Sequence, residues 1–461
     1  MKSTEEPRSG RLLAFRGAST LVLLLACGAA LALAETATAR QAPAQGQPQS
    51  TPSEEKRKPL EVSVELRLRN EFRDNADFKP ADDFDHFLGQ RLRINLRVRP
   101  HPRVTFFIQA QDVWLFGSNS DKVIHDLATN LHQAYFDWKL VPTGRWEFRG
   151  GRQEWIYGEE RLVGAFGWDH VGRSFDAARL RNRTGPWTND FFWGRMVDVR
   201  RNGARARAGQ QDLSGFYLAR APKDSPARVE LYGLFLRDGL RTSGEIVGAP
   251  RQTVRIATLG FRRVYRPKTG WRYSVENAWQ FGERGPDAHR AVMLVGTGGY
   301  AWGGRWQPRV QFEYDVATGD NNPTDGKSRE FHNLFPTNHP FYGYADLAGL
   351  RNLHDFRGMA AVTPHPKITL ELDYHRFLLA SPRGPWKNAA GRVLGFDPLA
   401  RFGRDLGHEV DVTFRLPLDK RLSFLAGYSA FIPGNFAIRT RGPETNHFAY
   451  IQTTFQFGQM Q

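Results

Sequence analysis

The residues best suited to chemistry in this sequence are four arginines between positions 91 and 99. Arg91, Arg93, Arg97 and Arg99 alternate with leucine, isoleucine and valine, and Asn95 takes the remaining polar position. A guanidinium is a planar, permanent cation that can donate two parallel hydrogen bonds to one carboxylate or phosphate. Successive side chains of a β-strand point to opposite faces, so one face of this stretch would be apolar and the other would bind anions.

The same alternation recurs along the chain, which decides what kind of element carries the arginines. It begins at Leu60 and returns in later stretches, among them 229–236, 254–265, 271–281, 368–375 and 448–457. We count 16 to 18 such stretches, separated by turns rich in Gly, Pro, Asn and Asp, and find no long helical pattern. About 22 residues per strand and connection suit the roughly 10-residue strands of an outer-membrane barrel.

A closed barrel is also the β-structure that satisfies every backbone group in lipid. A soluble propeller would need a fixed repeat, which is absent, and a soluble sandwich with a wholly apolar outer face would aggregate. The sequence therefore predicts an all-β protein, a transmembrane antiparallel β-barrel of about 18 strands, over residues 60–461.

The N-terminal residues predict export. A basic start and a short apolar run are followed by a small-residue site, so we expect a signal peptide over residues 1–34. Residues 35–59 lack periodicity and predict a disordered periplasmic leader. The only cysteine, Cys27, lies in the signal peptide, so the mature chain has no disulfide; lipidation of Cys27 stays open.

Composition narrows the class of partner. The net charge is +16 and most of the 64 basic residues are arginines. Nucleic acid is the usual partner of so basic a chain, but an exported protein without a nucleic-acid-binding motif does not fit that role. An anionic ligand outside the cytoplasm fits better.

Other motifs carry no chemistry in this interpretation. Gly296–Ala301 matches G-x-G-x-x-A, but no helix is expected after it, so a close backbone approach within a strand is favoured over a dinucleotide site. Thr318–Gly326 is acidic, yet its spacing does not match a calcium loop, and a turn-rich outer loop is favoured. Isolated histidines such as His132 and His375 are interpreted as lumen or interface residues. We expect no catalytic residue, no metal and no cofactor.

Residues 151–177 differ from the alternating stretches because they are dense in charge, glycine and tryptophan. They predict an ordered loop that folds inward and narrows the pore; a loop held outside by its own salt links is the alternative. The predicted pore-lining set comprises Arg67, Arg69, Arg91, Arg93, Arg97, Arg99, Arg149, Arg152, Glu154, Arg179, Arg181 and Arg309.

This segment resembles the alginate-export family of outer-membrane porins. The matching pieces are 151–154, 158–162, 167–168 and 173–177, with a second group at 318–320, 335–339, 342–346 and 350–353. The resemblance covers most of the chain from about residue 60. It implies an 18-stranded monomeric barrel whose arginine-rich lumen passes a polyanionic polysaccharide outward. The chain departs from the usual barrel in ending on Gly458–Gln461, not on an aromatic residue.

We therefore expect a non-enzymatic channel for an anionic polysaccharide such as alginate, set in outer-membrane lipid and without nucleic acid. A general porin for small anions and a non-conducting structural barrel remain alternatives. A barrel-embedded hydrolase is disfavoured because no nucleophile motif occurs. The cargo, the direction of transport and the need for a periplasmic secretion partner stay open.

Overall fold

A computed structural model describes residues 58–458, apart from residues 80–83, 118–129, 199–206 and 243–251. The predicted signal peptide, Cys27 and nearly all of the predicted leader lie outside the described residues.

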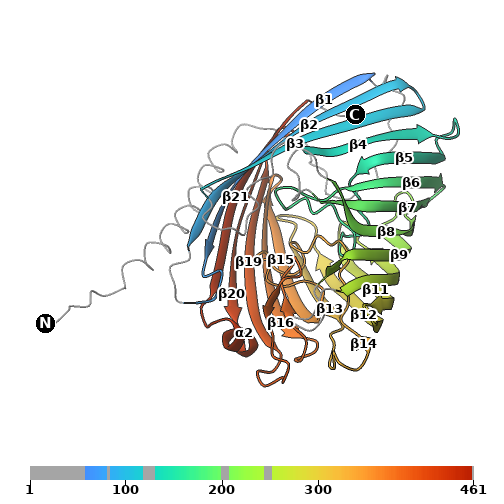
Figure 1. The fold of residues 1–461 in the computed structure, drawn as a ribbon. Helices are drawn as coiled ribbons and strands as arrows, with labels where there is room; N and C mark the ends of the chain where they lie inside the picture. Colours follow the sequence, from blue (N-terminus) through green and yellow to red (C-terminus); the bar gives the residue numbers. More distant parts are fainter. Residues whose placement is uncertain (1–57, 80–83, 118–129, 199–206, 243–251, 459–461) are drawn as a thin grey trace.

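Eighteen long strands of the described chain form one closed antiparallel barrel (Figure 1), as the alternation predicted. Each strand pairs with the next long strand along the chain, and β1 pairs with both β2 and β21, which closes the sheet. The strands are β1 (Leu60–Asp74), β2 (Asp85–His101), β3 (Val104–Phe116), β4 (Asn130–Lys139), β5 (Trp146–Gln153), β6 (Phe175–Thr184), β7 (Trp187–Asp198), β8 (Arg207–Arg220), β9 (Ala227–Thr242), β10 (Gln252–Tyr265), β11 (Gly270–Arg284), β12 (Asp287–Ala301), β13 (Arg309–Ala317), β15 (Leu353–His365), β16 (Ile368–Leu379), β19 (Asp405–Pro417), β20 (Leu422–Pro433) and β21 (Asn446–Phe457).

Four short elements lie in the connections. They are β14 (Lys327–Ser328), β17 (Trp386–Lys387), β18 (Val393–Gly395) and the six-residue helix α2 (Asn435–Thr440). In the described residues no helix is long and apolar enough to cross a membrane.

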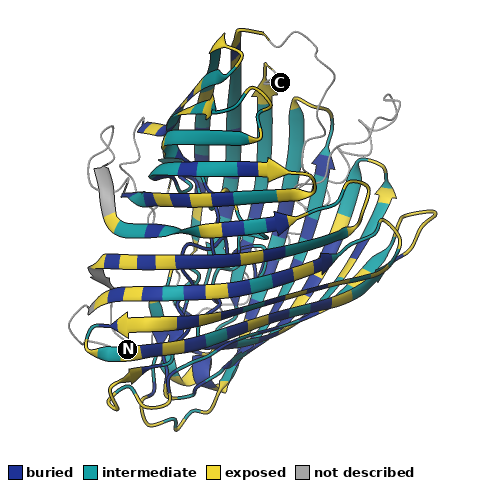
Figure 2. Cartoon of the chain, turned by 90° about the vertical axis from the view of Figure 1, so that its right-hand side faces the viewer, coloured by how far each residue is buried: buried dark blue, intermediate teal, exposed yellow. Residues whose placement is uncertain are grey.

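The period of two sets the two faces of the wall. In the β1–β2 pair, Arg67 lies opposite Arg91 and Val64 lies opposite Ile94. Arg91 is 6% exposed whereas Ile94 is 46% exposed, so the arginines face the lumen and the aliphatic side chains face outward. Buried and exposed residues alternate along the strands in the same way around the wall (Figure 2). An apolar outer face is what lipid requires.

The two ends of the barrel differ. One end carries tight connections such as 102–103, 185–186 and 366–367, and we call it the turn end. The other carries long connections, including 154–174, 318–352 and 380–404, and we call it the loop end. Barrels of this kind have short periplasmic turns and longer extracellular loops, so the turn end faces the periplasm.

The long connections fold into the barrel. Trp155, Phe335 and Trp386 come from three of them, and they belong to one buried apolar cluster with the wall residues Phe175 and Phe431. The ring of Trp155 stacks on Phe175 with 4.4 Å between centroids. Trp155 therefore lies inside the barrel, whereas several other tryptophans are exposed, namely Trp114, Trp138, Trp271, Trp279, Trp302 and Trp306.

The glycine-rich stretch at 296–301 lies within β12, as the strand interpretation predicted. A Cβ added to Gly299 would lie 2.3 Å from the backbone oxygen of Val310 on β13. The missing side chain thus permits a close approach of two strand backbones.

Candidate functional site in the barrel lumen

The strand register places ten of the twelve predicted pore-lining residues on the lumen face. Arg152 is the exception: it lies opposite Ala134 and Asp176 on the outward face and pairs with Asp176 through contacts of 2.7 and 3.0 Å. The prediction for Arg152 is wrong because residues three apart in a strand cannot share a face, and Arg149 faces inward. Glu154 follows β5 and begins the inward loop 154–174.

Three of the predicted arginines bind the inward loop. Arg67 donates hydrogen bonds of 2.8 Å to the backbone oxygens of Gly167 and Asp169. Arg69 donates to the oxygen of Trp168 at 2.7 Å, and its guanidinium lies 3.9 Å from the centre of the Trp168 ring. Arg91 donates to the oxygen of Gly167 at 3.2 Å. These cations hold residues 167–169 against β1 and β2, so the loop spans into the lumen as predicted.

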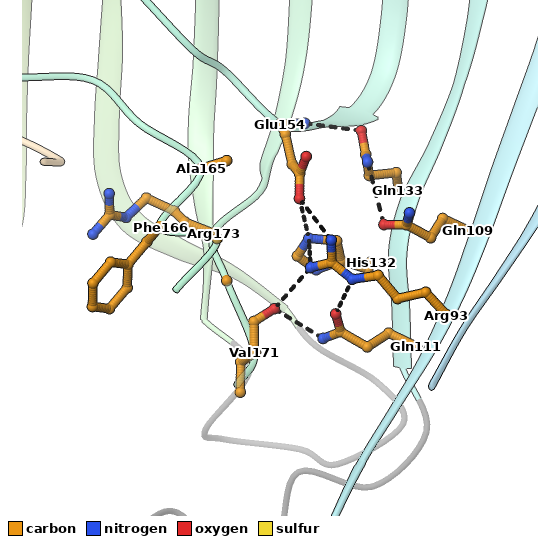
Figure 3. A network of polar contacts seen from close by, with 12 residues as sticks. Arg93, Gln109, Gln111, His132, Gln133, Glu154, Ala165, Phe166, Val171 and Arg173 are labelled. Atoms are coloured by element: carbon orange, nitrogen blue, oxygen red, sulfur yellow. Dashed lines mark hydrogen bonds and ion pairs between the residues drawn. The ribbon is translucent and has the colours of Figure 1, made fainter. Parts of the chain in front are cut away.

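Arg93 is the centre of a second contact with the loop (Figure 3). It donates to Gln111 at 2.7 Å and lies 3.2 Å from Nε2 of His132. His132 is 2.8 Å from the carboxylate of Glu154, which is also 3.5 Å from Arg93. Burial would raise the pKa of Glu154, but the hydrogen bond with His132 and the charge of Arg93 lower it below its ordinary value. Gln111 also binds the oxygen of Val171 at 2.9 Å.

His170, near the C-terminal end of the loop, lies between two charged wall residues. Its Nε2 is 2.9 Å from both the Arg69 guanidinium and the Glu71 carboxylate. Burial and the charge of Arg69 lower the pKa of His170 to about 4, although Glu71 opposes them. The histidine is therefore neutral near pH 7.

The inner part of the same loop carries a buried charge network. Arg161 is 2.7 Å from Glu313 and 2.8 Å from Asp315, both on β13, and it also donates to the Tyr342 hydroxyl at 2.9 Å. Glu159 pairs with Arg262 at 2.9 Å and with Arg266. Despite burial, these arginines lower the pKa of Glu159 to about 2. The loop is thus fixed to the wall on both sides of the lumen.

Arg173 joins two of the inward connections. It donates to the backbone oxygens of Gly164 at 3.0 Å, Phe335 at 2.6 Å and Pro336 at 3.1 Å. Burial lowers the pKa of Arg173 to about 10, which still leaves it charged at neutral pH. Loops 154–174 and 318–352 therefore form one packed unit within the loop-end half of the barrel.

A second set of arginines lies between the middle of their strands and the turn end. We call it the arginine mouth, and it comprises Arg97, Arg99, Arg149, Arg179, Arg181, Arg309 and Arg415. Arg149 forms a bidentate ion pair with Asp137 at 2.6 and 2.9 Å, and Arg309 lies 2.6 Å from the Glu371 carboxylate. A carboxylate takes two of the five N–H donors of a guanidinium, so each paired arginine retains donors for a further anion. All except Arg179 are only partly buried.

The charges of the lumen are unevenly distributed around the wall. On β13, β15, β16 and β19, seven inward carboxylates face three inward arginines in the described strands. Asp373 pairs with Arg357 at 2.7 Å, and Asp355 lies 2.9 Å from His375. The carboxylates are Glu313, Asp315, Asp355, Glu371, Asp373, Glu409 and Asp411, and the arginines are Arg309, Arg357 and Arg415.

The acidic stretch at 318–326 forms internal turns, as favoured over a calcium loop. Asp320 accepts hydrogen bonds from the backbone N–H of Asn322 at 2.8 Å and of Arg329 at 2.9 Å. Asp325 lies 2.7 Å from the Arg329 guanidinium. Its carboxylates thus stabilise the loop itself.

The predicted pore-lining set did not include Arg161, Arg262, Arg357 and Arg415, which lie on the lumen side of the structure. Arg161 lies in the charged segment 151–177, which marked the loop but not its partners on β13. Period-two alternation also placed Glu313 on the polar face of its strand. The partners themselves are set by closure of the barrel, which brings residues about 150 positions apart together.

Comparison with known proteins identifies the family of this chain and solved structures of similar fold. The model of the alginate export family matches residues 58–452. Among solved structures of Pseudomonas aeruginosa proteins, OccD3 (OpdP) aligns with a TM-score of 0.58 and 12% identity over 88% of this chain and 92% of that one. OccK2 (OpdF), solved in complex with glucuronate, aligns with a TM-score of 0.56 and 10% identity over 87% and 97%.

The outer membrane protein OprD aligns with a TM-score of 0.54 and 11% identity over 86% of this chain and 94% of that chain. At such identities the likeness concerns the fold alone. The comparison with curated proteins gave no significant match.

Proposed function

This chain belongs to the alginate export family and folds as a barrel of the bacterial outer membrane, and from that premise we propose that it is an anion-selective channel for a polyuronate. Alginate is the polyuronate that the family description suggests. The arginine mouth at the turn end carries the proposal, because it presents guanidinium groups at the periplasmic opening. Carboxylates of the polymer would meet these groups first on their way outward.

The pairing of the mouth arginines suits transport better than tight binding. Arg181 is held by Asp190 through two contacts of 2.6 Å, and Arg97 lies 3.2 Å from Glu61. Each arginine is thus fixed in position, and its net attraction for a passing carboxylate is reduced. A channel needs binding strong enough to draw the ion in and weak enough to release it. The glucuronate complex of OccK2 (OpdF) supports a uronate as ligand of this fold.

The arginines near the middle of the wall have a different role in this proposal. Arg67, Arg69, Arg91 and Arg93 are buried and engaged with loop 154–174, so they position the constriction instead of contacting cargo freely. Arg97, Arg99, Arg149, Arg179, Arg181 and Arg309 remain the proposed pore-lining set. The protein acts as a single barrel, and contact with a periplasmic secretion partner would occur at the turn end.

A porin for small anions is the second candidate, and the observation that favours it is the packed unit of inward loops in the loop-end half. The two functions are separated by single-channel current recorded in chloride while oligomers are added on the turn-end side. A polyuronate channel is blocked by an oligouronate and not by a neutral oligosaccharide of the same length. Current that neither oligomer blocks would favour the small-anion porin and contradict the proposal.

A further inference from the structure

A row of charged side chains crosses the outward face of the barrel at its loop end. The residues of this row lie opposite one another in register from β5 to β11, each paired with the next. Their order around the wall is Arg152, Asp176, Arg195, Asp212, Arg237, Arg255 and Glu283. We call it the charged row.

The charged row borders the apolar outer face. On β9, Arg237 follows Phe235 on the same face, and Phe235 is an exposed apolar side chain. On β10, Arg255 precedes Ala257 and the exposed Leu259 on the same face. From each of these arginines toward the turn end, the outward side chains of the next two positions are apolar or glycine. The arginines therefore stand where lipid chains give way to headgroups on the outer-leaflet side.

Most of the charged row is neutralised by its own neighbours. Arg152 forms a bidentate ion pair with Asp176, and Arg195 forms one with Asp212 at 2.5 and 2.8 Å. The pattern then breaks, because Arg237 and Arg255 lie directly opposite each other. Facing positions place side chains about 5 Å apart at Cβ, and like charges there are destabilising.

These two arginines lack a partner within the described chain. Both are exposed, and neither makes a side-chain hydrogen bond or ion pair with any described residue. Asp212 lies beside Arg237 but already holds Arg195, and Glu283 lies beside Arg255 without forming an ion pair. Arg290 on β12 adds another exposed outward arginine one strand beyond Glu283.

We propose that Arg237 and Arg255 form a binding site for the phosphate group of a phosphorylated outer-leaflet lipid. Two facing guanidinium groups present up to ten N–H donors, and each fork matches two phosphate oxygens. A bound phosphate would remove the repulsion between the two arginines. The apolar side chains beneath them, Phe235 and Leu259, would contact the acyl chains of the same lipid, which a free phosphate does not have.

The test uses the full-length barrel purified in detergent. It is titrated with a bis-phosphorylated glucosamine-disaccharide lipid or with the phosphate-free analogue of that lipid. Native mass spectrometry measures how many lipid molecules are bound. Wild type is expected to prefer the phosphorylated lipid. The Arg237→Gln/Arg255→Gln variant is expected to bind it about tenfold more weakly. Arg263→Gln is the matched control, since Arg263 is an exposed outward arginine near the turn end of β10, and it should bind like wild type.

Equal affinity of the double variant and wild type would overturn the site, as would equal binding of the phosphate-free lipid. Displacement of the lipid by millimolar inorganic phosphate would also overturn it, because that result describes a free-anion site. Heat-modifiable migration in gels confirms that each variant folds. If the glutamine variant does not assemble, Arg237→Lys/Arg255→Lys replaces it, because lysine keeps the charge but lacks the two-pronged guanidinium. Its affinity for the phosphorylated lipid should lie between the affinities of wild type for the phosphorylated and the phosphate-free lipid. An affinity for the phosphorylated lipid equal to that of wild type would contradict the bidentate site.

Discussion

The Arg69 guanidinium lies 3.9 Å from the ring centre of Trp168 and donates a 2.7 Å hydrogen bond to the backbone oxygen of the same residue. One wall cation is therefore joined twice to a loop residue 99 positions away. The neighbouring contacts of Arg67 and Arg91 act on the same short segment. In this barrel, arginines hold the inward loop as well as lining the proposed anion path.

We expect Arg69→Ala to release the loop. The variant loses the Trp168 contacts and leaves the Glu71 carboxylate, 1% exposed, with one arginine fewer. Loss of one partner of a buried ion pair costs about 3–5 kcal/mol of stability. Because this cost falls on the docked state, the loop should detach from the wall more often. Single-channel conductance should rise and become noisier. Arg263→Ala is the control on the outward face. Wild-type conductance in Arg69→Ala would contradict a role of Arg69 in holding the loop against the wall.

We expect the docked loop to loosen in acid. The pKa of His170 is about 4 in the docked loop, below its ordinary value near 6.5, so the undocked histidine binds a proton more readily. Docking is therefore favoured above about pH 6.5 and is lost as pH falls through about 4. Arg69, Arg67 and Glu71 face this histidine, and the two arginines oppose its protonation.

The measurement for His170 is conductance between pH 7 and 4. Wild type should show a rise over this interval, and His170→Gln, which keeps a neutral polar side chain, should show a smaller one. Identical pH profiles for the two proteins would exclude His170 as the group responsible.

We expect Arg161→Met to weaken the barrel itself. Glu313 and Asp315 would lose the cation that lies within 2.8 Å of both, in a site where Arg161 is 1% exposed. The free energy of unfolding should fall by about 3–5 kcal/mol. Urea-induced unfolding in lipid vesicles measures it. Arg173→Met is a loop comparison, because no carboxylate of the described residues lies at ion-pair distance from Arg173. A loss below about 1 kcal/mol for Arg161→Met would show that the network relaxes around the gap.

Features of this molecule that depend on neighbouring residues in the sequence could be predicted, whereas contacts between distant residues could not. Alternation is local, so it identified the strands, and it placed Arg91 inward and Ile94 outward. It also excludes a shared face for Arg149 and Arg152, and counting along β5 would have corrected that assignment. The number of alternating stretches predicted 16 to 18 strands, and the family resemblance implied 18. The density of charge, glycine and tryptophan in residues 151–177 predicted the inward loop.

The division between the two sets of arginines was not predictable from local pattern. Arg93 and Arg97 stand four residues apart on one face of β2, yet Arg93 contacts the loop whereas Arg97 lies in the arginine mouth. That difference depends on where residues 167–171 settle in the closed barrel. The facing pair Arg237 and Arg255 likewise depends on the register of β9 and β10, which no periodicity in either strand specifies.

Anion selection by the arginine mouth can be measured as the reversal potential under a salt gradient. Wild type should be anion-selective, and Arg97→Glu/Arg309→Glu should lower or reverse the anion-to-cation permeability ratio. The outward variant Arg263→Glu places one such charge reversal on the outer face of β10, away from the lumen, and should leave the ratio unchanged. If the mouth variant folds and keeps the wild-type ratio, the arginines at the turn end do not select the ion, which contradicts the proposed anion channel.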